Sequence, residues 1–197
     1  IQQQVEAATA EAGANLGEAK QAIERLSLLG TRLHDQPGMG ETAREVVEQA
    51  LNQYRVLLEK HGEDEGVRWE AARCFERAGF VQLELGQYNS AEQTLEQGLE
   101  LYEALPRTLD VDFERKRILV NLGHTKRYLE MWEESEAFYR EAVALLEELI
   151  GTRPADNAYV LRLANTLVNL CVVLTKDGRL EMAQRAYCRA IRLQVTI

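Results

Sequence analysis

The stretch LVNLGHTKRYLEMWEESEAFYREA, residues 119–142, decides the fold class. Small residues stand at Gly123, Ser135 and Ala142, with intervals of twelve and then seven positions between them. The same two intervals recur upstream and downstream, which indicates three copies of one repeating unit. The complete set of small positions is Gly79, Ala91 and Gly98, then Gly123, Ser135 and Ala142, then Cys171, Ala183 and Ala190.

Bulky residues keep the same register in all three copies. Four positions before the first small residue stand Phe75, Leu119 and Leu167. Four positions after the second small residue stand Leu95, Tyr139 and Tyr187. Small residues let two helix backbones approach closely, while large ones fill the groove of the adjoining helix. Each copy therefore predicts an antiparallel helix pair that stacks on the next pair.

The composition favours an all-α protein. Only three prolines interrupt 197 residues, and the strong helix formers Ala, Leu, Glu, Gln and Arg predominate. Residues 41–61 carry an apolar helical face and follow a helix that runs through Leu33, which makes a fourth, degenerate pair. We predict a right-handed superhelical stack of about eight helices. Its segments are an amino-terminal helix (1–34), a second helix (41–61) and three repeats (64–105, 108–151 and 155–197).

This pattern resembles the tetratricopeptide repeat, with three departures. The first small residues lie 44 and then 48 positions apart, against roughly 34 in the standard unit, which predicts longer helices. Glu130 stands in a turn where glycine is usual. Gln82 and Lys126 replace apolar residues, which affects the expected packing of their turns but not the architecture.

A second resemblance concerns the segments 22–39 and 44–54. They resemble the region that follows the membrane span in planctomycete serine/threonine protein kinases, whose repeats come next and carry motifs such as those at 121–123 and 137–142. The resemblance implies a parent chain with an amino-terminal kinase domain, a membrane span before Ile1, and this region as its carboxyl-terminal sensor or scaffold. On resemblance alone, we expect this region on the extracytoplasmic side.

Composition argues against several classes of partner. The net charge of −9 would repel a nucleic acid backbone. No run approaches the roughly 20 consecutive apolar residues of a membrane span, so we expect no direct membrane insertion. Cys74, Cys171 and Cys188 lack C-x-x-C spacing, so they predict neither a metal site nor a cofactor. We expect them to act as small residues in helical cores.

No catalytic residues are predicted. His34, His61 and His124 lie far apart in the sequence, and each is expected on or near a solvated part of a helix or loop. The motif Asp112-Phe113-Glu114 lacks the glycine of the kinase metal-binding triplet, and no glycine-rich phosphate loop is present. Any kinase domain of the parent therefore lies outside these residues, and we expect this region not to be an enzyme.

The predicted site is an inner groove lined by the first helix of each pair. Its residues are basic, amide and aromatic: Arg73, Arg77, Phe80, Arg117, Asn121, His124, Arg127, Tyr128, Asn165, Asn169 and Lys176. Such a groove would bind a protein or peptide, preferably an acidic one. One alternative is that these arginines belong to solvated helix faces and pair with glutamates. Another is a homodimer formed through Val168, Val172 and the tail 191–197.

Overall fold

A computed structural model of the chain describes residues 2–153 and 157–195, with side chains from Gly13 onward. That part of the chain is built from eight α-helices and contains no strand, which confirms the all-α prediction. Position 155, where the third repeat was predicted to start, and the last two residues of the apolar tail lie outside the described residues. The helices are α1 (Gln2–His34), α2 (Gly40–His61), α3 (Glu65–Glu84), α4 (Tyr88–Glu103), α5 (Leu109–Tyr128), α6 (Trp132–Thr152), α7 (Asn157–Lys176) and α8 (Leu180–Val195).

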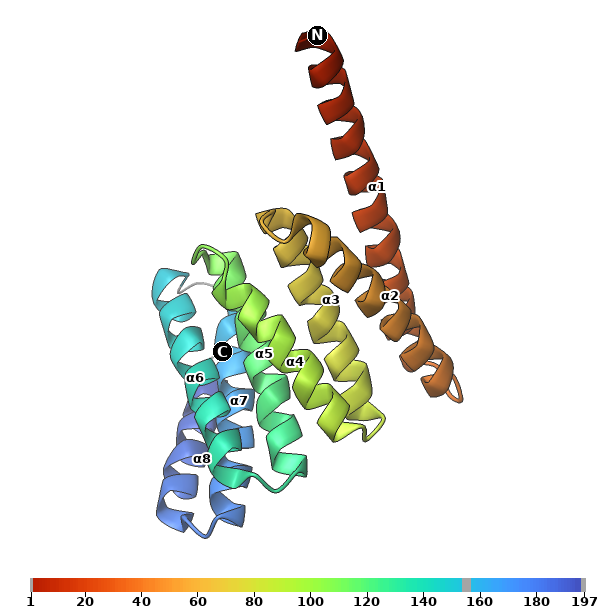
Figure 1. Ribbon diagram of the computed structural model, residues 1–197. Helices are drawn as coiled ribbons and strands as arrows, with labels where there is room; N and C mark the ends of the chain where they lie inside the picture. Colours follow the sequence, from red (N-terminus) through yellow and green to blue (C-terminus); the bar gives the residue numbers. More distant parts are fainter. Residues whose placement is uncertain (1, 154–156, 196–197) are drawn as a thin grey trace.

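The helices form a stack of four antiparallel pairs (Figure 1). Each helix packs on its neighbours in the sequence, and the first helices of the pairs also meet, α1 with α3 and α3 with α5. The amino-terminal part of α1 projects beyond the rest of the stack (Figure 1). The first helices α1, α3, α5 and α7 therefore share one face of the molecule.

The repeated small residues are the close-approach points inside the pairs. A Cβ atom on Gly79 would lie 2.5 Å from the Leu95 side chain, and one on Gly123 would lie 2.7 Å from the Tyr139 ring. Leu95 and Tyr139 are the bulky residues four positions after the second small residue of their copies. The glycines are therefore required because the partner helix occupies the space that a side chain would need.

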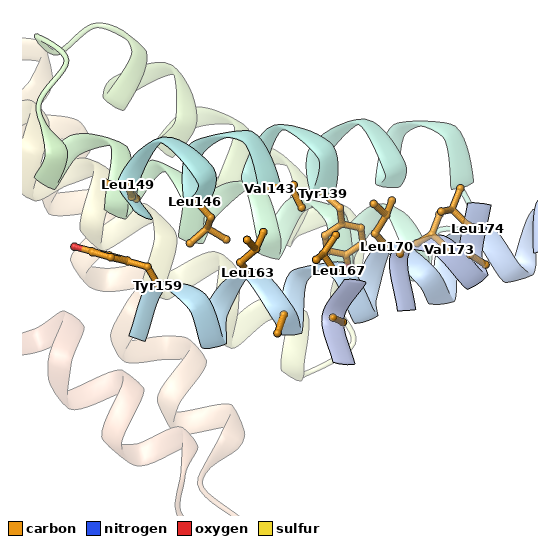
Figure 2. Close-up of a cluster of buried hydrophobic side chains, with 14 residues drawn as sticks. Tyr139, Val143, Leu146, Leu149, Tyr159, Leu163, Leu167, Leu170, Val173 and Leu174 are labelled. Carbon is orange, nitrogen blue, oxygen red and sulfur yellow. The ribbon is translucent and has the colours of Figure 1, made fainter. Parts of the chain in front are cut away.

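The largest apolar cluster lies among α6, α7 and α8 (Figure 2). Leu146 of α6 lies opposite Leu163 of α7, and Tyr139 of α6 lies beside Leu167 (Figure 2); all four side chains are buried. Helix α7 is apolar and long enough to meet the length and composition criteria for a membrane span. In this fold its leucines pack against α6 and α8, which is a sufficient reason for its apolar sequence.

The turns inside the three repeats share one backbone feature. Gly86, Glu130 and Gly178 stand at equivalent positions and have positive φ values of 74°, 61° and 76°. Glycine adopts this left-handed conformation without strain, whereas a residue with a Cβ atom does so at a cost. Glu130 thus adopts the same backbone conformation as the two glycines, at some cost in strain, and the turn keeps its geometry.

Lys126, one of the two polar residues at apolar positions, is buried and ion-paired. Its Nζ lies 2.6 Å from a carboxylate oxygen of Glu134 on α6 and also pairs with Glu92 on α4. The lysine thereby joins three helices, and its ion pairs offset the cost of burying a charge where the repeat usually has an apolar residue. Gln82 is also buried, but its Oε1 has no hydrogen-bond partner within the described part of the chain.

The cysteines only partly follow the expectation of core positions. Cys74 is buried and Cys171 is partly buried, but Cys188 is exposed on α8. The prediction is therefore wrong for Cys188. The reason is that its helix has no further helix packed on its outer side in the described structure.

Candidate functional site: a cavity on the face of the first helices

A cavity of about 320 Å³ opens on the face formed by the first helices of the four pairs. Every residue that lines it comes from α1, α3, α5 or α7. Most of these side chains are polar, with four cations and one carboxylate among them. The lining consists of Thr31, Glu76, Arg77, Phe80, Lys116, Arg117, Val120, Asn121, Arg162, Asn165, Thr166 and Asn169.

The predicted groove residues divide into two groups. The structure brings together, around the cavity, Arg77, Phe80, Arg117, Asn121, Asn165 and Asn169. The others lie outside the lining, namely Arg73, His124, Arg127, Tyr128 and Lys176. The cavity is thus shorter along the helices than the groove expected from repeat positions, because it covers only part of the length of each first helix.

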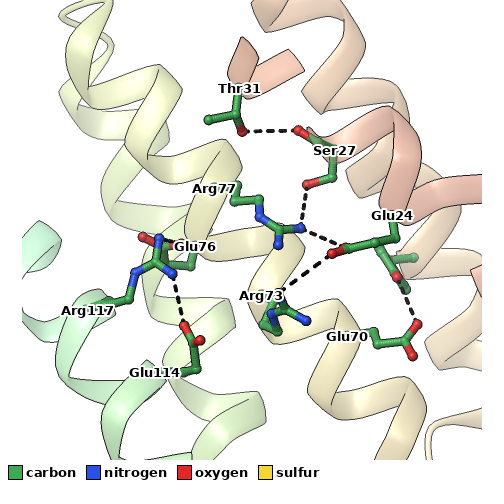
Figure 3. A network of polar contacts seen from close by, with 10 residues as sticks. Glu24, Ser27, Thr31, Glu70, Arg73, Glu76, Arg77, Glu114 and Arg117 are labelled. Carbon is green, nitrogen blue, oxygen red and sulfur yellow. Dashed lines mark hydrogen bonds and ion pairs between the residues drawn. The ribbon is translucent and has the colours of Figure 1, made fainter. Parts of the chain in front are cut away.

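On the α1–α3 side, the arginines are occupied by carboxylates of this chain (Figure 3). Arg77 donates to Glu24 of α1 over 2.7 Å and lies 3.4 Å from the Ser27 hydroxyl. Arg73 lies 3.7 Å from the other oxygen of Glu24. Because only 10% of the Arg77 side chain is exposed, this ion pair is largely shielded from water and holds α1 against α3.

On the α3–α5 contact, Arg117 is also occupied (Figure 3). Its guanidinium lies 3.0 Å from Glu76 of α3 and 3.1 Å from Glu114 on its own helix. Asn121 donates its amide to the other oxygen of Glu76 over 2.9 Å. Burial raises the pKa of Glu76, whereas Arg117 opposes that shift. These residues connect two repeats, and 41% of the Arg117 side chain is exposed.

His124 departs from the solvated setting expected for the histidines. It is partly buried, and the Tyr139 hydroxyl of α6 lies 3.0 Å from its Nδ1. Asn169 of α7 approaches the other ring nitrogen at 3.5 Å. Burial, followed by the charge of Arg127, lowers the pKa of His124 to about 4. The ring is therefore neutral at physiological pH and connects α5 to α6 and α7.

Tyr128, Arg127 and Lys176 lie beyond the cavity. The Tyr128 ring stacks on Tyr88 of α4 with centroids 4.8 Å apart and an interplanar angle of 3°. The Arg127 guanidinium lies 4.8 Å from the centre of the Tyr128 ring. Lys176 is exposed at the end of α7. The ring of Tyr128 is therefore engaged with α4 and not with the cavity.

Two cations of the lining were missed by sequence reasoning. Lys116 of α5 and Arg162 of α7 both line the cavity, yet neither belongs to the predicted groove. Their spacing held the signal: Arg162 lies three and seven positions before Asn165 and Asn169, so it shares their helix face. Lys116 likewise lies four positions before Val120, which also lines the cavity.

The lining of the cavity is rich in groups that donate hydrogen bonds. It offers amide groups, guanidinium groups and one ammonium group, which bind carboxylates and peptide backbones. Within residues 2–153 and 157–195, no three His, Cys, Asp or Glu side chains are grouped so as to hold a metal ion.

Comparisons with known proteins agree with the architecture. A tetratricopeptide-repeat family pattern matches residues 72–105, which span α4 and most of α3. That match covers one repeat of the chain. No curated protein matches the sequence.

Solved structures of similar architecture extend the likeness to nearly the whole chain. One is BtubC (BKLC) from P. vanneervenii, with a TM-score of 0.53, 17% identity, and coverage of 98% of this chain and 87% of that one. Another is a putative kinesin light chain from Podosopora anserina with nearly identical TPR-like repeats; its TM-score is 0.58, with 14% identity and coverage of 90% and 96%. At these identities the likeness shows the fold alone. Tetratricopeptide-like repeat folds are generally non-catalytic and typically bind proteins.

Proposed function

We propose that this domain binds a protein or peptide segment along the face formed by α1, α3, α5 and α7. The observation that carries the proposal is the cavity of about 320 Å³, which is lined by all four first helices. Asn165 is exposed in that lining, and no hydrogen bond within the described structure occupies its amide. Free amides at such a position can bond to the backbone of an extended peptide.

The charge of the lining favours an acidic segment. Four cations line the cavity together with a single carboxylate, Glu76, although the whole chain carries a net charge of −9. A basic patch on an acidic molecule attracts acidic ligands and directs their approach. An acidic peptide is therefore the ligand class that we propose.

A display library of random peptides, selected against the domain, tests the binding function. Selected peptides should lose affinity by about tenfold on Asn165→Ala or Asn169→Ala, the effect of one or two lost hydrogen bonds. The matched control is Asn89→Ala, since Asn89 is exposed on α4 and does not line the cavity. If the control weakens binding as much as the cavity variants, the face of the first helices is not the binding surface.

A second candidate function is the pairing of two chains through α8. Tyr187 is 50% exposed, whereas Tyr139, at the same position in the preceding repeat, is fully buried. Ile191 and Val195 extend this exposed apolar stripe along α8. An unpartnered face of this kind favours association.

Light scattering over a wide range of concentrations tests the pairing. Ile191→Lys should convert a dimer into a monomer, whereas a wild-type monomer at every concentration would exclude pairing by the isolated domain. Charge at Leu193 is less suitable because this side chain packs against the core cluster of α6, α7 and α8.

We also propose, from the resemblance of residues 22–39 and 44–54, that the module is a sensor or scaffold region of a membrane-attached serine/threonine kinase on its extracytoplasmic side. The coding frame upstream of Ile1 tests the first part, because it should encode a kinase catalytic loop and then a membrane span. The exposed thiol of Cys188 tests the second. A maleimide that cannot cross membranes should label it in intact cells, and labelling only after lysis would place the domain inside.

A further inference from the structure

On the side of the second helices, the stack has three equivalent junctions. They lie between α2 and α4, between α4 and α6, and between α6 and α8, and both helices of each junction pack on the first helix between them. The residue three positions after the first small residue of each repeat forms the floor of its junction. These floor residues are Gln82, Lys126 and Leu174. One geometry therefore carries three different chemistries.

The α4–α6 and α6–α8 junctions satisfy their floor residues with groups of this chain. Lys126 pairs with Glu92 of α4 and Glu134 of α6. Beside it, Phe138 of α6 packs against the neighbouring apolar clusters. The floor of the α6–α8 junction is Leu174, which is buried and apolar. Neither floor residue therefore has an unpaired polar side-chain atom in the part of the chain that the structure describes.

The α2–α4 junction differs because polar residues take both of these positions. Gln82 forms the floor, and Thr94 of α4 stands where the following repeat has Phe138. A cleft of about 290 Å³ lies at this junction and is lined by residues of α2, α3 and α4. Gln82 is only 5% exposed, yet its Oε1 has no hydrogen-bond partner among the described residues. A buried polar atom without a partner costs free energy, which a ligand with a matching group would recover.

The lining of this cleft suits neutral groups that form hydrogen bonds. Its two charged residues are engaged, since Glu48 accepts a hydrogen bond from Arg44 over 3.0 Å and Arg55 donates to neighbouring side chains. The acceptors of Arg55 are the amide oxygens of Asn52 and Gln97, so the N–H groups of these two amides are left to donate. The neutral polar residues of the lining are Asn52, Gln82, Ser90, Gln93, Thr94 and Gln97.

We propose that this cleft binds a glutamine or asparagine side chain from an uncharged, extended segment of a partner protein. An amide supplies both the N–H that the Oε1 of Gln82 lacks and a carbonyl oxygen for the amides of the walls. The terminal torsion of glutamine is broad, so the Gln82 amide can turn towards the ligand. Ser90 and Gln97 lie about 10 Å apart along α4, which matches about three residues of extended chain. The site is separate from the cavity of the first helices and does not depend on the acidic peptide proposed there.

The random-peptide library tests the proposal when it is first depleted on Thr94→Phe and then selected on the wild type. This variant carries the residue of the equivalent position in the next repeat, and it should fill the cleft while leaving the cavity of the first helices intact. Depletion thus removes peptides that bind the first helices. The enriched peptides should share a glutamine or asparagine, and leucine in its place should weaken binding at least tenfold in fluorescence anisotropy. Enriched peptides without an amide, or no enrichment at all, would overturn the proposal.

Gln82→Leu tests the floor of the cleft directly. It introduces the residue that the third repeat has at this position, Leu174, and removes the unpaired amide. The variant should raise the urea midpoint of the free protein and weaken the enriched peptides at least tenfold, because the amide is costly only while it is unpaired. Gln184→Leu, at an exposed position of α8 outside the cleft, is the matched control and should change neither quantity. A lower urea midpoint for Gln82→Leu, or an unchanged peptide affinity, would each overturn the proposal.

Two further variants keep the outcomes distinct. If Thr94→Phe does not fold, depletion on Gln82→Leu takes its place, and Gln93→Ala tests the exposed wall of the cleft. Asn165→Ala separates this site from the cavity of the first helices. Peptides bound in the cleft should keep their affinity for Asn165→Ala, whereas peptides bound in the cavity should lose affinity there and tolerate Gln82→Leu. A loss of the cleft peptides on Asn165→Ala would exclude a second site without affecting the first.

Discussion

The two sides of the cavity differ in how their cations are used. On the α1–α3–α5 side, Arg77 and Arg117 are paired with Glu24, Glu76 and Glu114. On the α5–α7 side, Lys116 and Arg162 both lie near the ring of Phe113, and neither forms an ion pair in the part of the chain that the structure describes. The same residue types therefore connect repeats on one side and have no ion-pair partner among the described residues on the other. A count of basic groove residues cannot distinguish these roles, because the difference depends on the carboxylates that face them.

The ion pairs on the α1–α3–α5 side should make the largest contribution to the stability of the protein. Arg77→Met should lower the free energy of unfolding by about 3 to 5 kcal/mol, because Glu24 loses its best partner in a largely shielded setting. Urea denaturation measures the loss, and hydrogen exchange should show α1 opening first.

The matched control for Arg77 is Arg140→Met on α6. Arg140 is half-exposed and pairs with Glu136 on its own helix, so its loss should change stability by less than about 1 kcal/mol. Equal effects of the two variants would contradict the view that Arg77 fastens α1 to α3.

Lys116, on the α5–α7 side, should make the stability of the protein depend on pH. The pKa of Lys116 is about 8 in the folded protein and close to 10.5 in an unfolded chain, so the unfolded state binds more protons between these values. The wild type should therefore gain stability from pH 8 to pH 10 relative to Lys116→Met, by on the order of 2 kcal/mol. Urea denaturation of both proteins at several pH values measures the gap. A constant gap would mean that Lys116 is not held in a desolvated site.

His124 should make the stability of the protein depend on pH below neutrality. Its pKa is about 4 in the folded protein and about 6.5 when unfolded, so its contribution is complete above pH 6.5 and is lost as the pH falls towards 4. Thermal melting from pH 7 to pH 4 should show a loss of about 1 to 2 kcal/mol that His124→Gln lacks. His61→Gln, at an exposed histidine of α2, is the matched control and should follow the wild type. A wild-type curve parallel to that of His124→Gln would contradict the assignment.

The smallest expected effect is a change in peptide affinity when Arg117 loses one of its carboxylate partners. Glu76→Gln removes a buried charge beside Arg117 and preserves an acceptor for Asn121. An acidic peptide selected from the display library should then bind roughly threefold to tenfold more tightly, the effect of one unit charge across a partly solvated groove. Fluorescence anisotropy measures the change, with Glu84→Gln, at an exposed position of α3, as the control. Unchanged affinity would show that the charge of Glu76 is not felt at the ligand.

Much of the fold was predictable because it depends on local periodicity. The intervals of twelve and seven residues placed Gly79 and Gly123 opposite the bulky residues that now fill their space, Leu95 and Tyr139. Positions in the turns were equally clear, since Glu130 adopts the positive φ of the glycines at equivalent positions. Exposure of Cys188 was not predictable from spacing, because spacing does not reveal whether another helix covers α8.

The candidate site was only partly predictable. The amide residues Asn121, Asn165 and Asn169 follow from repeat positions and do line the cavity. Arg73 and Tyr128 occupy related positions but are directed to partners on other helices, Glu24 of α1 and Tyr88 of α4. Arg127 instead lies against Tyr128 on its own helix. Lys116 and Arg162 lay outside the assumed repeat positions, although their helical spacing placed them on the same faces.

The sequence by itself determined the helices, their pairing and the face on which a ligand would be sought, because these follow from propensity and from the alternation of small and large residues along the chain. Only the tertiary structure decided which cations are neutralised. Ion pairs such as Arg77 with Glu24 join residues more than fifty positions apart, and the interaction of charges depends on distance and burial in space. The difference in ion pairing between the two sides of the cavity therefore arises from how the repeats stack.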